Sequence, residues 1–359
     1  MELLASQEDM SQDEALRFLR KMEQSDQLGS FEAAYQTVKY LRQKISDSQW
    51  GKAREALDLV KEQSARLLKG QRESSVGNMI RRVMKIIKDE HFSSGKEKTD
   101  ERDTQESLQK LLLADDDEEE YNQPKENLKE SVIDSMCELL SELETSAEIV
   151  CANSLEHIQN NEVIMTLGNS RLVEQFFKTA VNKKRKFQVI IVESFPNYRG
   201  HELAKALTEA DIKTTVVSDA AVFAMMSRCN KVIIGTNSVM ADGGLKASSG
   251  THTLALAAKH YSVPLIVLAP MYKLTPQYLS SYDQDKFNQT ISPHHVLPYN
   301  SGEIINRVSV SCPLYDYVPP DLVSTYATNI GGYAPPYIYR LLADLYHPDD
   351  YNLKQELNS

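Results

Sequence analysis

The sequence predicts an α/β protein in which an N-terminal helical domain is followed by a Rossmann-like domain with a doubly wound parallel sheet. Residues 8–92 carry apolar side chains at spacings of three and four, which is typical of amphipathic helices. From residue 161 onward, short apolar runs alternate with helical patterns, which is typical of parallel βαβ units. We place the boundary near residue 160, which gives domains 1–160 and 161–359.

Composition excludes several classes of protein. A net charge of −11 argues against a general nucleic-acid-binding protein, which needs a basic face. No apolar run approaches the roughly 18 residues of a membrane span, and the acidic start MELLASQEDM is not a secretory signal, so we expect a cytosolic protein without membrane contact. The four cysteines form no CxxC pair, which favours reduced thiols and no metal site (Cys137, Cys151, Cys229 and Cys312).

Polar segments at 93–103 and 114–124 interrupt the helical domain, and the second contains the acidic run DDDEEE. Both are expected to be solvated loops. A single long helix is predicted from Lys125 to Ile158. The helix before the first loop carries a cluster of cations, which is either a solvated face or a docking surface for an acidic partner (Arg81, Arg82, Lys85 and Lys88).

Five strands are predicted in the second domain, each a short apolar run, with a sixth at Arg307–Ser311 (the five are Val163–Leu167, Val189–Val192, Thr214–Val217, Val232–Ile234 and Leu265–Leu268). Doubly wound sheets commonly place their strands in the order 3-2-1-4-5, which puts the ligand crevice between the first and fourth strands. The Tyr- and Pro-rich tail that follows, from 312 to 346, either seals the core or contacts another protein.

The long loop at 235–250 lies where such domains bind ligands, but it contains neither a P-loop nor a GxGxxG fingerprint. A helix beginning near Thr251 could hold an anion through its free N–H groups, with Lys246, Ser249 and Gly250 nearby. The alternative is that these residues merely cap the helix. Asp242 has no evident partner in the loop.

The crevice itself lacks chemical groups. It would be lined by Gly168-Asn169-Ser170 and Thr236-Asn237-Ser238, and neither turn contains a Cys, His, Asp or Glu. An enzyme needs an acid, a base or a nucleophile at such a position. The predicted scaffold is therefore one that enzymes use, but the positions expected to be catalytic carry no acid, base or nucleophile. No cofactor is expected.

Several long motifs identify a family resemblance. The stretches NEVIMTLGNSRLVEQF, VSDAAVFAMMSRCNKVIIGT, GTNSVMADGGLKASSGTHTLALAAKH, CPLYDYVPP and YIYRLLADLYHPDD resemble the regulatory alpha, beta and delta subunits of eukaryotic translation initiation factor 2B. The same domain is similar to isomerases of methylthioribose 1-phosphate and ribose bisphosphate. Their catalytic Cys and Asp positions correspond here to Gly168 and Asn237, and neither residue can exchange a proton near neutral pH. The resemblance therefore implies a non-catalytic descendant of that scaffold.

The family further implies an assembly with alpha, gamma, delta and epsilon subunits that exchanges GDP for GTP on initiation factor 2. Its regulatory subunits are implied to build the core and to sense the phosphorylated alpha subunit of that factor. A sugar-phosphate isomerase, or a sugar-phosphate or nucleotide sensor without catalysis, remains the alternative. We expect the delta subunit to contact the sheet edge and switch-point surface, and the substrate factor to contact the long helix near Ser131 and Asp134 (sheet candidates: Asn161, Glu162, Gln188, Phe195, Tyr198 and Arg199).

Overall fold

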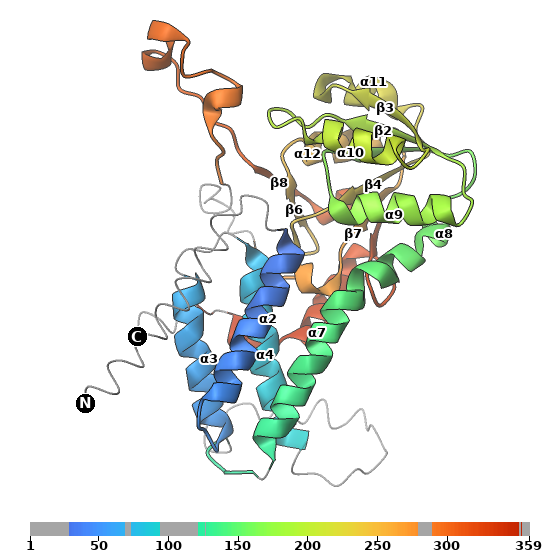
Figure 1. Ribbon diagram of the computed structural model, residues 1–359. Coiled ribbons are helices and arrows are strands. Elements are labelled where there is room, and N and C mark those ends of the chain that lie inside the picture. Colours follow the sequence, from blue (N-terminus) through green and yellow to red (C-terminus); the bar gives the residue numbers. More distant parts are fainter. Residues whose placement is uncertain are drawn as a thin grey trace. The chain divides into compact units, whose positions relative to one another are not determined.

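A computed structural model describes residues 29–68, 73–93, 121–125, 127–278, 289–351 and 353. The chain divides into two compact units (Figure 1). The helical unit comprises Met1–Glu144 together with Ala343–Ser359, and the sheet unit comprises Thr145–Leu342. This division differs from a single boundary near residue 160. A continuous helix crosses residue 144, and periodicity alone does not reveal where the packing partners of a helix change.

Four long helices build the described part of the helical unit: α2 (Ser30–Asp47), α3 (Ala53–Leu68), α4 (Ser74–Ser93) and α7 (Leu128–Ala152). Helix α4 packs against both α2 and α3, and its apolar face is fully buried through residues such as Ile80 and Val83. Lys129 of α7 donates hydrogen bonds of 2.8 Å to the carbonyls of Ser46 and Ser48, which close the C-terminal end of α2.

The helix predicted from Lys125 to Ile158 is shorter in the structure. Helix α7 ends at Ala152, and the separate turn α8 (Ser154–His157) follows it. The break redirects the chain so that Ile158 enters the core of the sheet unit, where it is fully buried. Residues 8–28 of the region predicted to be helical and most of both polar loops lie outside the described residues.

Cations of α4 bind the C-terminal segment of the same chain. Lys85 Nζ donates a 2.5 Å hydrogen bond to the carbonyl of Asp344, near the end of α14 (Ile338–Leu345). Arg81 donates to the carbonyls of Asp350 and Tyr351, each at 3.1 Å. These contacts differ from both sequence interpretations of this cluster, because Arg81 and Lys85 bind backbone carbonyls of the same chain.

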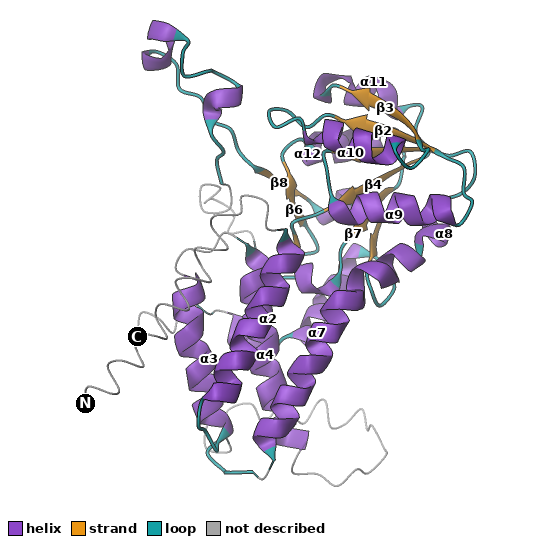
Figure 2. Ribbon diagram, in the orientation of Figure 1, coloured by secondary structure: helices purple, strands orange, loops and turns teal. Residues whose placement is uncertain are grey.

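The sheet unit contains a seven-stranded sheet in the order β10-β9-β7-β4-β1-β2-β3 (Figure 2). Five of these strands realise the predicted order 3-2-1-4-5, which is confirmed: β3 (Lys213–Val217), β2 (Gln188–Val192), β1 (Val163–Leu167), β4 (Lys231–Gly235) and β7 (Leu265–Leu268). All neighbouring pairs among them are parallel. Helices α9 (Arg171–Asn182), α10 (Arg199–Thr208), α11 (Val222–Met226) and α12 (Thr251–His260) connect them.

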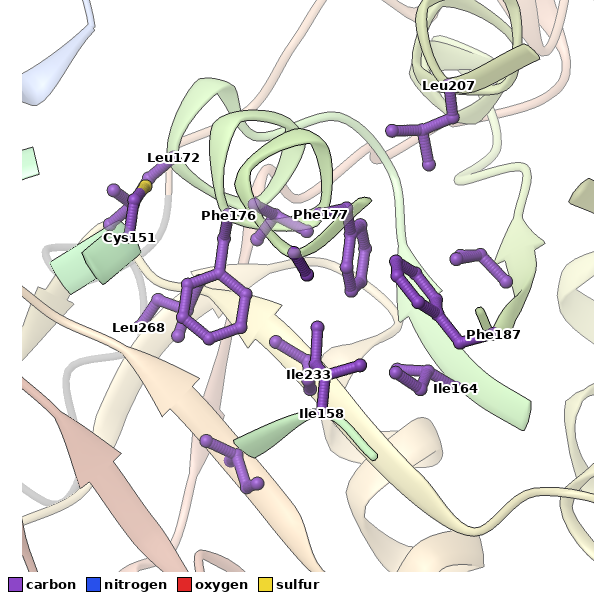
Figure 3. Close-up of a cluster of buried hydrophobic side chains, with 14 of the residues drawn as sticks. Cys151, Ile158, Ile164, Leu172, Phe176, Phe177, Phe187, Leu207, Ile233 and Leu268 are labelled. Carbon is purple, nitrogen blue, oxygen red and sulfur yellow. The ribbon is translucent and has the colours of Figure 1, made fainter. Parts of the chain in front are cut away.

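One face of this sheet carries a continuous apolar core (Figure 3). Phe176 and Phe177 of α9 are fully buried there, with their ring centroids 6.5 Å apart. Ile164 of β1 and Ile233 of β4 face them from the sheet. Strand centres that are buried on both faces explain why these segments read as unbroken apolar runs in the sequence.

The predicted strand at Arg307–Ser311 is wrong. Residues Gly302–Asn306 form a 3-10 helix, and 308–312 have no regular structure. The place beside β7 is taken by β9 (Thr325–Ala327), which is parallel to it, and antiparallel β10 (Gly332–Tyr333) adds the edge. The alternation of Val308 and Val310 resembles that of a strand. The strand beside β7 is instead β9, whose Tyr326 side chain is fully buried.

The segment 235–250 is not an open loop. It contains a hairpin formed by β5 (Ser238–Val239) and β6 (Leu245–Ser248), and β6 also pairs with β8 (Tyr315–Val318) in a small antiparallel sheet. This second sheet occupies the site where the sequence suggested a flexible ligand loop.

Candidate functional site

The crevice predicted between the first and fourth strands lies at the carboxyl ends of β1 and β4. Gly168 follows β1 with φ of 62°, a left-handed conformation that favours glycine. The Ser170 side chain lies directly over Gly235 at the end of β4, because a Cβ atom added to Gly235 would fall 2.6 Å from Ser170 Oγ. The two turns therefore fill this end of the crevice with their own atoms.

Asn237, the second position compared with the isomerases, belongs to a hydrogen-bonded network. Its backbone N–H donates to the carbonyl of Lys246 at 3.0 Å, and its side-chain amide lies 3.4 Å from the hydroxyl of Tyr315. The Lys246 ammonium sits 4.6 Å from the centroid of the same tyrosine ring, a cation–π contact. The predicted anion ligand Lys246 is thus engaged with Tyr315.

The N-terminus of α12, predicted to hold an anion, already binds a carboxylate of this chain. Asp316 Oδ2 accepts hydrogen bonds from the backbone N–H groups of Gly250 at 2.6 Å and His252 at 3.3 Å. The Thr251 hydroxyl, which is buried, donates to the carbonyl of Ser248, and Ser249 N–H donates to the carbonyl of Leu314. Negative charge is stabilised at helix N-termini, and the Asp316 carboxylate lies where a phosphate would bind.

Asp242, which lacks an evident partner in the sequence, fixes the tip of the β5–β6 hairpin. One carboxylate oxygen accepts from the Gly244 N–H at 2.7 Å and the other from the Tyr317 hydroxyl. Burial and this bond to a carboxylate raise the pKa of Tyr317 above its ordinary value. Tyr326, which is fully buried, donates to the carbonyl of Gly243. These tail tyrosines seal the unit, one of the two roles that the sequence suggested for them.

Sequence reasoning missed Asp316, Tyr315 and Tyr317 as part of this site. These three residues are consecutive in β8, so their side chains point to alternate faces, and each pairs with a residue of β6. The available signal in the sequence was the period-two pattern of CPLYDYV. That pattern identifies a strand but does not indicate which segment the strand pairs with.

The six interface candidates in the sheet unit fall at two separate ends of the sheet. Asn161, Glu162 and Gln188 lie at the start of β1 and β2, where Glu162 forms a 2.9 Å ion pair with Lys231. Phe195, Tyr198 and Arg199 follow the end of β2. A five-residue strand separates the two groups by roughly 16 Å, so each can be tested by its own substitutions.

The second group contains a small exposed aromatic cluster. The rings of Phe195 and Tyr198 meet edge to face with centroids 5.7 Å apart, and Tyr198 also contacts His201 at 5.9 Å. Phe195 and Tyr198 are 47% and 43% exposed. Aromatic residues of this kind are enriched in protein interfaces.

The two candidates in the helical unit, Ser131 and Asp134, lie on α7, where Asp134 is exposed. Next to them, α7 and α4 border an open groove of about 390 Å³ with a strongly acidic lining (Arg82, Ile86, Asp89, Glu90, Ser135, Glu138, Leu139 and Glu142). Ser135 donates to Glu90 at 2.7 Å, and Arg82 lies 3.6 Å from Glu142. The acidic lining suits a basic partner surface.

Among the residues with described positions, no three His, Cys, Asp or Glu side chains come close enough to hold a metal ion. Within the same ranges, no helix is both long and apolar enough to cross a membrane.

Comparison with known proteins gives a match along most of the chain. The model of the "Initiation factor 2 subunit family" matches residues 26–335. The chain is 40% identical to "Translation initiation factor eIF2B subunit beta" of Dictyostelium discoideum, over 93% of this chain and 95% of the relative. In structure it is similar to a chain of the tetrameric eIF2B-beta2-delta2 complex from C. thermophilum, with a TM-score of 0.67, 26% identity and coverage of 94% and 95% of the two chains.

An enzyme also appears among the relatives. The chain is 28% identical to "Ribose 1,5-bisphosphate isomerase" of Archaeoglobus fulgidus, over 61% of this chain and 69% of the enzyme. The two kinds of relative share a scaffold but differ in activity, so the site residues must distinguish between them.

Proposed function

Because this chain belongs to the initiation factor 2 subunit family, we propose that it is a regulatory subunit of the guanine-nucleotide exchange factor that acts on initiation factor 2. The observation that carries the proposal is the extent of the match with the Dictyostelium beta subunit, which spans 93% of this chain and 95% of that one. Both the helical and the sheet unit fall within it, so the whole architecture is shared.

We propose further that the chain is not an enzyme. Three features of the crevice support this: glycine at 168 and asparagine at 237 supply no acid, base or nucleophile, and Ser170 fills the space beside Gly235. The anion position at α12 also favours a structural role. A phosphate that bound there would have to displace Asp316 from two backbone N–H groups.

The delta subunit is the proposed direct partner, since the similar structure is a beta2-delta2 tetramer. The start of β1 and β2 and the cluster of Phe195, Tyr198 and Arg199 are two candidate surfaces, and their separation makes them independently testable. Charge reversal at Arg199 should weaken the complex if the second surface contacts delta, whereas Lys184→Glu, at another exposed cation, serves as the control. Unchanged affinity would remove the second surface from the proposal.

The substrate factor is the proposed occupant of the acidic groove on α4 and α7. Regulation would then arise from coupling between binding sites. A partner that binds one arrangement of the assembly more tightly raises the population of that arrangement and so changes the exchange activity of the assembly. The alpha, gamma and epsilon subunits complete the proposed assembly in the cytosol.

The direct test is co-expression of the tagged chain with a delta subunit, followed by mass determination in solution and a GDP-release assay on initiation factor 2. We expect a stable complex with delta and no exchange by the isolated chain. Failure to bind delta, or full exchange activity from the chain alone, would overturn the proposal.

A sugar-phosphate isomerase or sensor is the second candidate, favoured by the relationship to the ribose bisphosphate isomerase. Thermal shift measurements with ribose 1,5-bisphosphate, together with a turnover assay, test it. Binding without turnover that disappears in Lys246→Ala and Thr251→Val would indicate a sensor. Neither shift nor turnover is expected, and their absence removes this candidate.

A further inference from the structure

An exposed apolar patch lies on the outer faces of α11 and α12. We define it as the aromatic patch, formed by Phe223, Leu256, His260 and Tyr261. The Phe223 ring lies 5.0 Å from the His260 ring and 5.1 Å from the Tyr261 ring, measured between centroids. Leu256 and His260 are four residues apart on α12 and therefore share one face of the helix.

The side chains of the patch are accessible although they are large and apolar. Phe223 is 50% exposed, Leu256 53% and Tyr261 37%. The opposite sides of both helices are buried, through Val222 and Leu254, so the helices are firmly anchored and the exposure is confined to their outer faces. Contiguous exposed apolar groups on a well-packed element mark interaction sites more often than isolated ones do.

The sequence segment that carries the patch is less acidic than the rest of the chain. The chain has 51 acidic residues, but the segment 220–282, which contains both helices, has Asp242 alone, against five lysine and arginine residues. Two of these cations are exposed, Arg228 just after α11 and Lys259 on α12, and neither forms an ion pair with a carboxylate among the described residues. Lys259 Nζ donates a hydrogen bond to the backbone carbonyl of Asp321, at 3.3 Å.

We propose that the aromatic patch is a docking surface for an acidic segment of another subunit in the exchange-factor assembly. The segment would place an aliphatic or aromatic side chain against Phe223 and Leu256, and Asp or Glu side chains beside Arg228 and Lys259. Charge complementarity selects this occupant, because a second copy of the chain would bring two cationic rims together. The inference rests on the proposed function and adds to it a contact surface and the chemistry of its partner.

The contact is tested in the complete assembly with a photoreactive phenylalanine analogue at position 256. The control is the same analogue at Ile330, a side chain that is 54% exposed and lies outside the patch. We expect position 256 to crosslink to one subunit, at a segment rich in Asp and Glu that also carries an apolar residue. A second experiment compares the double variant Phe223→Ala with Leu256→Ala to the unsubstituted chain. We expect the double variant to bind that subunit about tenfold or more weakly.

Charge gives an independent check. The variant Arg228→Glu with Lys259→Glu should lower the association rate and reduce its dependence on salt, while binding to delta is measured alongside. Crosslinking no stronger than at Ile330, a crosslink to a second copy of the chain, or a crosslinked segment without acidic residues would overturn the inference. If the unsubstituted chain binds delta but the patch fails these tests, only the patch is refuted. If the unsubstituted chain does not bind delta, the proposed function is refuted and the inference with it.

Discussion

Lys88 Nζ lies 2.9 Å from both carboxylate oxygens of Asp350, and both side chains are almost completely buried. The two residues are 262 positions apart, so this ion pair ties the C-terminal segment to α4 inside the helical unit. Arg81 completes the attachment through the carbonyls of Asp350 and Tyr351. Burial lowers the pKa of Arg81 below its ordinary value, but Arg81 remains charged at neutral pH.

Breaking this pair from one side should be strongly destabilising. Asp350→Ala leaves the Lys88 ammonium buried without its carboxylate, and such changes cost about 3–5 kcal/mol. Urea denaturation measures the loss, with the exposed neighbour Asp349→Ala as the control. The double variant Lys88→Met with Asp350→Leu should be less destabilised than the sum of its single variants, because both charges are removed. Additive losses would show that the pair is not coupled.

Removing the internal carboxylate at α12 should create the anion site that the sequence suggested. Asp316→Ala frees the N–H groups of Gly250 and His252, so we expect a loss of about 1 kcal/mol in stability and new binding of phosphate. Thermal denaturation with and without inorganic phosphate measures both effects. The exposed Asp321→Ala is the matched control and should show neither. Equal phosphate binding by the wild-type chain would mean that Asp316 does not block the site.

Restoring the two missing groups should not restore an enzyme. In the variant Gly168→Cys with Asn237→Asp, the cysteine must adopt φ of 62°, and its Cβ lies 3.3 Å from that of Ser194. A left-handed residue with a side chain costs roughly 1–2 kcal/mol. We expect a destabilised protein without isomerase turnover, measured with ribose 1,5-bisphosphate. Turnover by this variant would show that the rest of the isomerase site is intact.

The four thiols should differ in their reactivity in the folded protein. Burial raises the pKa of Cys229 to about 11, and that of Cys151 also to about 11, whereas Cys137 is exposed. At pH 8, a thiol reagent should therefore label Cys137 in the folded protein and the three buried cysteines, Cys151, Cys229 and Cys312, only after unfolding. Rapid labelling of Cys229 in the native state would contradict its burial.

The same shift has a consequence for stability. The pKa of Cys229 is higher in the folded state than its unfolded value of about 8.5. The contribution of this difference to the stability of the fold is therefore complete below about pH 8.5. The contribution is lost progressively as pH rises toward about 11. Denaturation curves between these values should show falling stability, with a shallower slope in Cys229→Ala. An identical slope in the variant would assign the decline to other groups.

Much of the sheet unit was predictable because its signals are local. Strands such as Val232–Ile234 are buried on both faces, so each reads as a short apolar run, and the polar turns between them mark the helix starts. Right-handed crossovers then limit the order of the strands. The absence of an acid, a base or a nucleophile at the two compared positions was equally visible, since the identities of Gly168 and Asn237 do not depend on packing.

The sequence by itself thus determined the α/β class, the order of the five central strands and the absence of a proton-exchanging group at the two compared positions. Only the tertiary structure decided that Asp316 fills the N-terminus of α12, that the cations of α4 hold the C-terminal segment, and that β9 rather than Arg307–Ser311 extends the sheet. The physical reason is the same in each case. These pairings join residues between roughly 60 and 260 positions apart, and the choice among many polar or strand-like candidates depends on which of them packing brings within reach.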